Sequence, residues 1–230
     1  KVPSFGKSFI CIDDKNNNEV IKKIKIKNFY TYGVNPKSQF YINNIRQSRN
    51  FSEFNLNIKL PGKKNMDIKN IKIPLLGLHN IRNSSAAAAV SLTIGISKDI
   101  IKQGLKEFKG VQRRFNKIFT YRETEFFDDY AHHPTEIKEV LDGVKEAYKK
   151  EQIVCVFQPH RISRLKDLKD EFSSSFIKAD VVVLCPIYKA GEKLKLGFSY
   201  TSFAKKIIKD SKVKVYLVKD QNHLTKFIRQ

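Results

Sequence analysis

Acidic and imidazole side chains gather in one short stretch of the sequence, at Asp128, Asp129, His132 and His133. Carboxylates and imidazoles can hold metal ions, transfer protons or bind polar ligands. An apolar and aromatic lead-in precedes them, and Pro134 follows, a residue suited to the first turn of a helix. The pattern therefore predicts a strand, a polar loop and a helix N-terminus, with the loop as a candidate site.

Two further polar loops follow predicted strands, at 158–164 and 186–192. Arg161 and Arg164 stand three residues apart at a predicted helix start, where both guanidinium groups can face one anionic group. Loops at the carboxyl ends of parallel strands share one edge of the sheet, so we expect the three loops to converge. Each residue alone also fits a simpler role, with Asp129 as a turn cap and the histidines and arginines as solvated surface residues.

The elements expected around these loops define an α/β protein in two parts, with a short hinge near 110–116. The first part is an α/β start followed by hairpins, with strands near 7–14, 28–32, 39–43, 51–60 and 66–74 and helices near 16–23, 83–94 and 98–108. The second alternates strands near 125–129, 153–157, 180–185 and 214–218 with helices near 134–149, 164–175, 202–209 and 222–229. That alternation predicts a parallel sheet with right-handed crossovers. With 230 residues and 41% hydrophobic content, the chain can bury a sizeable core.

The Ala-rich helix near 83–94 is preceded by polar residues of its own. Asn80 is expected to act as its N-cap, and Asn83 to project from the first turn. A side-chain amide both donates and accepts a hydrogen bond, as the edge of adenine requires. Arg113 and Arg114 lie at the expected hinge, where they are either a surface pair or a contact to phosphate or ribose.

The formal net charge of +21 raises the hypothesis of a basic nucleic-acid-binding α/β protein. The lysines are spread along the chain and often alternate with Ile or Asn, a texture more typical of a solvated surface, so nucleic acid is disfavoured as a partner. No apolar run approaches the roughly 20 residues of a membrane span. Cys11, Cys155 and Cys185 lie far apart in apolar, strand-like runs, which indicates reduced thiols and a cytoplasmic location.

Five motifs occur in order along the chain: Gly77-x-His79-Asn80-x-x-Asn83, Phe108-x-Gly110-Val111-x-Arg113-Arg114-Phe115, Asp128-Asp129-Tyr130-Ala131-His132-His133-Pro134-Thr135-Glu136, Phe157-Gln158-Pro159-His160-Arg161 and Tyr188-x-Ala190-Gly191-Glu192. Together they resemble the Mur ligases, over essentially the whole chain. Within that family the chain is most similar to the ligases that join L-alanine to UDP-N-acetylmuramate. A related murein-peptide ligase shares the His-His-Pro loop and stays an alternative.

The resemblance implies the rear part of a central ATP-binding domain at 1–112 and a Rossmann-like, amino-acid-binding domain at 113–230, truncated at its end. It implies ATP and Mg²⁺ as cofactors, and UDP-N-acetylmuramate and L-alanine as substrates of a cytoplasmic, acyl-phosphate reaction in peptidoglycan synthesis. The residues implied at the nucleotide are Asn80, Asn83, Arg114 and Asp129, and those at the amino acid are Tyr130, His132, Arg161 and Arg164. Lys189 and Glu192 are secondary candidates for the amino-acid pocket.

The chain also departs from the family pattern. It contains no Gly-x-x-x-x-Gly-Lys-[Ser/Thr] phosphate loop, and the UDP-sugar domain, the metal-binding Glu and His and the final Gly-Ala-Gly segment of the family are unmatched. We therefore expect no catalytic or metal-ligating residue in these 230 residues and no turnover by the chain alone. A noncatalytic module derived from a ligase is a third hypothesis. Asn116 stands where the family has Glu, and Ser84-Ser85 where it has Ala-Leu.

Overall fold

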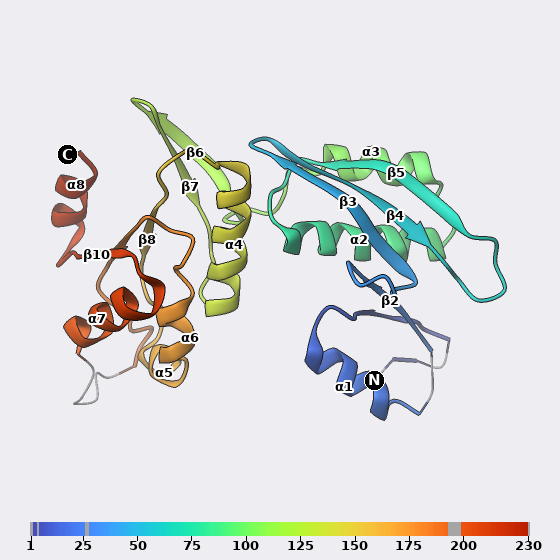
Figure 1. The fold of residues 1–230 in the computed structure, drawn as a ribbon, viewed down its shortest axis with the longest axis horizontal. Coiled ribbons are helices and arrows are strands. Elements are labelled where there is room, and N and C mark those ends of the chain that lie inside the picture. Colours follow the sequence, from blue (N-terminus) through green and yellow to red (C-terminus); the bar gives the residue numbers. More distant parts are fainter. Residues whose placement is uncertain (1, 4, 26–27, 193–198, 230) are drawn as a thin grey trace. The chain divides into compact units, whose positions relative to one another are not determined.

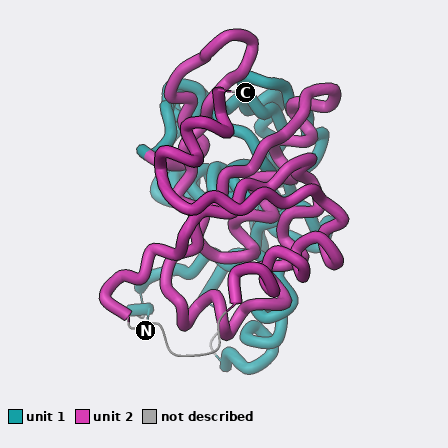
Figure 2. Tube along the Cα trace, turned by 90° about the vertical axis from the view of Figure 1, so that its left-hand side faces the viewer, with its two compact units in different colours: residues 1–112 teal, residues 113–230 magenta. Residues whose placement is uncertain are grey.

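The structure is a computed structural model that describes residues 2–3, 5–25, 28–192 and 199–229. The chain forms two compact units, Lys1–Gln112 and Arg113–Gln230, which are coloured separately in Figure 2. We refer to them as unit 1 and unit 2.

Unit 1 is built on a five-stranded sheet in which the strand order follows the chain order (Figure 1). Its strands are β1 (Ser8–Cys11), β2 (Phe29–Gly33), β3 (Phe40–Ser48), β4 (Phe51–Ile58) and β5 (Met66–Ile73). The first three strands run parallel, and β4 and β5 continue the sheet with antiparallel pairing. This mixed sheet confirms the expected α/β start followed by hairpins.

Three helices accompany this sheet: α1 (Lys15–Lys23), α2 (Leu78–Thr93) and α3 (Lys98–Glu107). The Ala-rich helix α2 packs across β1 to β4, and α3 packs against β5. Ala88 and Ala89 are fully buried, and their small side chains allow the helix to approach the sheet closely. Phe40, Phe54 and Ile81 are also fully buried and form the centre of this core.

Helix α2 begins earlier than the sequence predicted, and Asn80 is not its N-cap. Gly77 occupies the cap position with a φ of 90°, a conformation that residues with a Cβ disfavour. Asn80 lies inside the first turn, where its Nδ2 donates to the Leu76 carbonyl at 2.7 Å. The prediction was wrong because the backbone freedom of glycine, rather than a side-chain acceptor, makes the turn into this helix.

Unit 2 carries the expected parallel sheet, with its strands in the order β10-β9-β8. These strands are β8 (Val154–Phe157), β9 (Val181–Leu184) and β10 (Lys214–Leu217), and the central β9 is buried along its whole length. The helices that connect or follow the strands are α4 (Pro134–Ala147), α5 (Ile162–Asp167), α6 (Lys169–Ser174), α7 (Tyr200–Ser211) and α8 (Gln221–Arg229). Phe172, Phe176 and Phe203 are buried in the core of this unit.

Two features of unit 2 differ from the expectation. Strand β7 (Thr124–Asp128) forms an antiparallel hairpin with β6 (Asn116–Tyr121) rather than joining the parallel sheet. The connection is the two-residue turn after Tyr121, and a turn that short joins antiparallel strands only. The single helix expected at 164–175 is divided into α5 and α6 at Leu168, whose φ of −112° and ψ of 29° interrupt the helical path.

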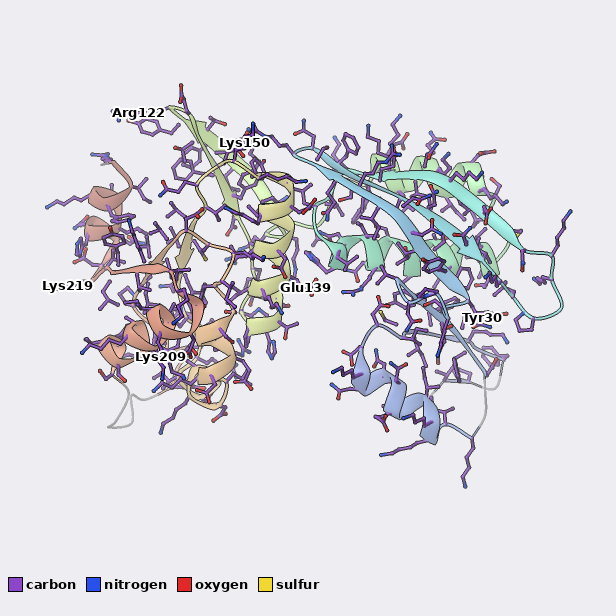
Figure 3. The ribbon with its side chains drawn as sticks, viewed as in Figure 1. Tyr30, Arg122, Glu139, Lys150, Lys209 and Lys219 are labelled. Carbon is purple, nitrogen blue, oxygen red and sulfur yellow. The ribbon has the colours of Figure 1, made fainter. Side chains whose placement is uncertain are left out.

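Charged side chains cover both units. Lys150, Lys209 and Lys219 lie at separate places on unit 2 (Figure 3), as expected for a solvated lysine-rich surface. In the described part of the chain, none of the helices has the length and apolar character needed to cross a bilayer. The three cysteines are free thiols, of which Cys185 is buried.

Candidate functional site

The loop after β7 is fixed first by Asp129. Its Oδ2 accepts from the Phe115 N–H at 2.7 Å, and its Oδ1 accepts from the Ala131 N–H at 2.7 Å. The carboxylate therefore ties the start of β6 to the turn that follows β7, so Asp129 has the turn-capping role that the sequence allowed. Its contact with ribose remains a prediction.

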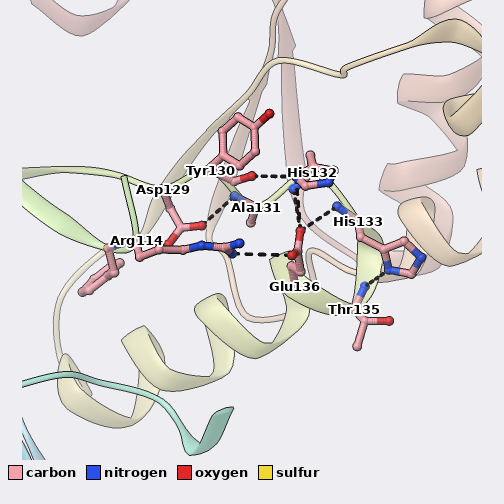
Figure 4. A network of polar contacts seen from close by, with 9 residues as sticks. Arg114, Asp129, Tyr130, Ala131, His132, His133, Thr135 and Glu136 are labelled. Atoms are coloured by element: carbon pink, nitrogen blue, oxygen red, sulfur yellow. Dashed lines mark hydrogen bonds and ion pairs between the residues drawn. The ribbon is translucent and has the colours of Figure 1, made fainter. Parts of the chain in front are cut away.

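A second carboxylate, Glu136, organises the other end of this loop (Figure 4). His133 is the N-cap of α4, Pro134 stands in the first turn as predicted, and Glu136 closes a capping box. One carboxylate oxygen, Oε2, accepts from the N–H groups of His132 at 3.0 Å and His133 at 3.2 Å. The other, Oε1, lies 3.4 Å from Nη1 of Arg114.

The Tyr130 ring of this loop contacts both an arginine and a histidine. The Tyr130 N–H donates to the Arg113 carbonyl at 2.7 Å, and the Arg113 guanidinium lies 5.0 Å from the centre of the Tyr130 ring. The His132 ring meets Tyr130 edge-on at 5.0 Å, and its Nδ1 lies 2.9 Å from the Tyr130 carbonyl oxygen. Two of the residues predicted for the amino-acid pocket are therefore in direct contact.

The second and third loops are joined by main-chain bonds. The Arg161 N–H donates to the Tyr188 carbonyl at 2.9 Å, and the Tyr188 N–H donates to the Pro159 carbonyl at 2.9 Å. The rings of His160 and Tyr188 stack at 5.4 Å. Arg161 is exposed and has a φ of 68°, which the bonding on both sides of it maintains.

Glu192 adds a side-chain clasp between the same two loops. Its Oε2 accepts from the Ser163 N–H at 3.0 Å, and its Oε1 accepts from the Ser163 hydroxyl at 2.7 Å. These bonds from Ser163 hold the pKa of the Glu192 carboxyl below its ordinary value. The structure thus gives Glu192 a contact that organises the loop, while Lys189 lies exposed beside it.

All three loops act on one imidazole, that of His160. Desolvation and then the charges of Arg164, Arg161 and His132 lower its pKa, and the charge of Glu192 opposes them. The second and third loops meet as the sheet topology predicted. The first loop follows β7, which lies outside the parallel sheet, so its convergence with the other two stays a prediction. Among the described residues, Nη1 of Arg164 is buried without a hydrogen-bond acceptor. A cluster of cations with an unsatisfied guanidinium nitrogen is suited to a carboxylate ligand.

The candidate nucleotide residues are divided between the two units. Asn80 and Asn83 lie three residues apart on α2 in unit 1, Asn80 half-buried and Asn83 exposed. Arg114 and Asp129 belong to unit 2 and border the loop that begins the amino-acid pocket. Nowhere in the described chain do three or more His, Cys, Asp or Glu residues gather as a metal site would require.

Some residues that take part in the contacts of the site were not predicted as site residues. Glu136 could have been found by its position three residues after a helix cap, the spacing of a capping box. Arg113 was noted with Arg114 at the hinge, and His160 within the second polar loop, but neither was assigned to the amino-acid pocket, since their contacts depend on tertiary geometry. Asn116, noted as a departure from the family pattern, accepts from the Arg114 N–H at 2.9 Å and so shapes the turn into β6.

Comparison with known proteins agrees with this arrangement. The family model described as "Mur ligase, glutamate ligase domain" matches residues 113–230, and the one described as "Mur ligase middle domain" matches residues 1–91. The chain belongs to the Mur ligase family. The resemblance of its five motifs is therefore confirmed.

The curated relatives that match this Mur ligase chain carry the same enzyme name. The chain is 70% identical over 229 residues to the UDP-N-acetylmuramate–L-alanine ligase of Pelagibacter ubique, covering 100% of the chain and 49% of the relative. It is 38% identical over 199 residues to the Bartonella tribocorum protein of the same name, covering 86% and 42%. The solved structure of a UDP-N-acetylmuramate–alanine ligase from Thermotoga maritima matches with a TM-score of 0.66 and 30% identity, covering 86% and 41%. The chain thus spans about half or less of the length of each relative.

Proposed function

We propose that this Mur ligase chain is part of an enzyme that joins L-alanine to UDP-N-acetylmuramate with ATP. Residues 1–112 are proposed as the rear part of its ATP-binding domain and residues 113–230 as its amino-acid-binding domain. The observation that carries the proposal is the 70% identity, over 229 residues, to a relative of that name. The five motifs and the contacts between the second and third polar loops of unit 2 support it.

The amino acid is proposed to bind among the loops of unit 2. Arg161 and Arg164 supply guanidinium groups for its carboxylate, and the unsatisfied Nη1 of Arg164 supports this role. Tyr130 and His132, which contact one another, form the adjoining wall. By holding the carboxylate, these residues orient the amine for attack on an activated acyl group, and positioning of this kind can contribute much of a rate enhancement.

Four residues are proposed for the nucleotide, two in each unit. Asn83 on α2 is exposed and offers an amide group suited to adenine, and the Asn80 amide, whose Nδ2 also donates to the Leu76 carbonyl, is proposed to act with it. Arg114 supplies a cation for phosphate or ribose, and Asp129 a carboxylate for the ribose hydroxyls. ATP activates the sugar carboxylate by phosphorylation, and the residues named here bind and orient the nucleotide.

Magnesium is proposed as the companion of ATP, but its ligands are not assigned to this chain. The described residues contain no group of three or more His, Cys, Asp or Glu side chains that could hold a metal ion. We propose a cytoplasmic location for the reaction, which the free thiols of all three cysteines support.

The proposal is tested in a chimera in which residues 1–230 replace the 229 matched residues of the Pelagibacter ubique relative. Phosphate release is expected to require ATP, UDP-N-acetylmuramate and L-alanine together. Folding is checked by circular dichroism and thermal melting. A folded chimera that uses another amino acid in preference to L-alanine contradicts the substrate assignment, and one that releases no phosphate contradicts the activity.

Two variants of the chimera test the amino-acid pocket. Arg161→Ala and Arg164→Ala are each expected to raise KM for L-alanine at least tenfold, because each removes a charge-assisted bond of about 1.5–3 kcal/mol. KM for ATP is expected to change less than threefold. Lys166→Ala is the matched control, since Lys166 is an exposed cation on the same helix. An unchanged KM for L-alanine in both arginine variants refutes the pocket.

A further inference from the structure

Glu136 contacts one residue from each of the two proposed ligand sets. Its Oε1 lies 3.4 Å from Nη1 of Arg114, which we assign to the nucleotide. Its Oε2 accepts from the His132 N–H at 3.0 Å and lies 3.5 Å from Nδ1 of His132, which we assign to the amino acid. The side chain is 33% exposed and that of Arg114 is 48% exposed, so the pair is partly in contact with solvent.

A helix-capping role alone does not account for this geometry. A capping box needs one side-chain acceptor for main-chain N–H groups, and glutamine provides that acceptor as well as glutamate does. Here Oε2 performs the capping, while Oε1 is directed at Arg114, which lies 22 residues earlier in the chain and outside the helix. Both oxygens therefore have to accept at once, and only a carboxylate can do this.

The electrostatics agree with the contacts. Partial burial acts to raise the pKa of Glu136, but the N–H donors of His132 and His133 and the charges of His132 and Arg114 outweigh it and hold the pKa below its ordinary value. The carboxyl is therefore ionised at neutral pH. One ionised oxygen faces the guanidinium of Arg114 and the other lies beside the imidazole of His132, so the carboxylate favours one arrangement of the two side chains.

We propose that Glu136 is a positioning residue that couples the nucleotide site to the amino-acid site, by holding Arg114 with one oxygen and the His132 loop with the other. This inference rests on the proposed function. Glu136 acts through its two neighbours, so its loss affects the use of both substrates. A residue that only capped α4 would affect stability alone.

The discriminating variant is Glu136→Gln in the chimera described above. The glutamine oxygen can keep the cap, but its NH₂ group then faces Arg114 and cannot accept from it. We expect the melting temperature to stay within about 2 °C of the parent, as for a change worth well under 1 kcal/mol. We expect kcat/KM to fall about two- to fivefold for both ATP and L-alanine, the effect of one partly exposed ion pair. Glu146→Gln is the matched control, because Glu146 on the same helix pairs only with the exposed Lys149 among the contacts described.

A double-mutant cycle then tests the coupling itself. In an Arg114→Ala background, Glu136→Gln is expected to lower kcat/KM for ATP less than twofold further, because the partner of Oε1 is already absent. The inference is overturned if Glu136→Gln lowers the melting temperature and leaves both kcat/KM values unchanged, or if the two substitutions act independently on ATP. A parent chimera without L-alanine-dependent phosphate release overturns the proposed function as well, so the two failures are distinguishable.

Discussion

Nε of Arg82 donates to Oδ2 of Asp13 at 2.8 Å, and this pair ties helix α2 to the parallel edge of the sheet in unit 1. The Asp13 side chain is only 8% exposed. Its two oxygens also accept from the N–H groups of Val34 and Asn35, each at 3.0 Å. One carboxylate thus joins the segment after β1, the segment after β2 and the helix that carries the proposed adenine residues.

Replacing Asp13 by alanine is expected to destabilise the protein strongly. The substitution removes the acceptor for two main-chain donors and a largely buried guanidinium, which corresponds to about 3 kcal/mol. Urea unfolding of the chain, followed by circular dichroism, measures the loss. Asp14→Ala is the matched control, because Asp14 only caps α1, and loss of such a cap costs about 1 kcal/mol. Equal losses for the two variants contradict the central role of Asp13.

Gly33 is expected to tolerate no side chain, because it lies directly against Asp13. Its φ is 147°, and a Cβ built on it lies 2.5 Å from Oδ1 of Asp13. Gly33→Ala should therefore cost both backbone strain and displacement of the carboxylate, together about 3 kcal/mol. Gly62→Ala separates the two effects, since Gly62 also has a positive φ of 71° but has no atom within 4 Å of the added Cβ. For Gly62→Ala, the same urea experiment should show a smaller loss in the free energy of unfolding, about 1 kcal/mol.

The parts of the fold that follow from local pattern could be predicted. The buried strand β9 is a continuous apolar run, and Pro134 marks the start of α4, so both were expected near their observed places. Strand β6 was not expected, because its residues are mostly exposed and show no alternation of apolar and polar side chains. Without β6, β7 was assigned to the parallel sheet.

The candidate site was likewise predictable only in part. The contacts between the loops after β8 and β9 agree with the rule for parallel sheets, since both strands belong to the parallel sheet. That rule does not apply to His132, because β7 lies in a separate hairpin. The bond between Arg114 and Glu136 did not follow, because it depends on the turn that Asn116 shapes before β6. Contacts of this kind are set by tertiary geometry, and no local pattern reports them.

The pKa of His160 should respond to the arginines that surround it. Desolvation and the charges of Arg164, Arg161 and His132 lower this pKa in the folded state, from an ordinary value of about 6.5. Between the folded and the unfolded pKa of His160, the unfolded chain binds more protons than the folded chain. The stability associated with the neutral ring is therefore fully present above about pH 6.5 and is lost as pH falls through the folded pKa. An NMR titration of the His160 ring in the chain is expected to give a pKa below 6.5.

The cause of that shift is tested by substitution. Arg164→Ala should move the pKa of His160 back toward its ordinary value, because it removes the largest of the charges that lower it. Lys166→Ala, an exposed cation on the same helix, should leave the titration unchanged. An unaltered His160 titration in the Arg164 variant places the arginine away from the imidazole and contradicts this cause of the shift.

The clasp between Glu192 and Ser163 is expected to hold the third loop against the start of α5, and through it the Arg161 side chain. Glu192→Ala removes the acceptor of both Ser163 donors, whereas Ser163→Ala removes only the hydroxyl and keeps the main-chain bond. We therefore expect faster amide hydrogen exchange over residues 186–192 in both variants, with the larger increase in Glu192→Ala.

The chimera carrying Glu192→Ala should show a higher KM for L-alanine, by about threefold or more, since Arg161 at the N-cap of α5 loses its support. Because its bonds to Ser163 lower the pKa of Glu192, the clasp should persist below the ordinary glutamate range and open only as pH falls through the folded pKa. Asp167→Asn, at the far end of the same short helix, is the control; equal exchange in all three variants and the parent means that the clasp does not order the loop.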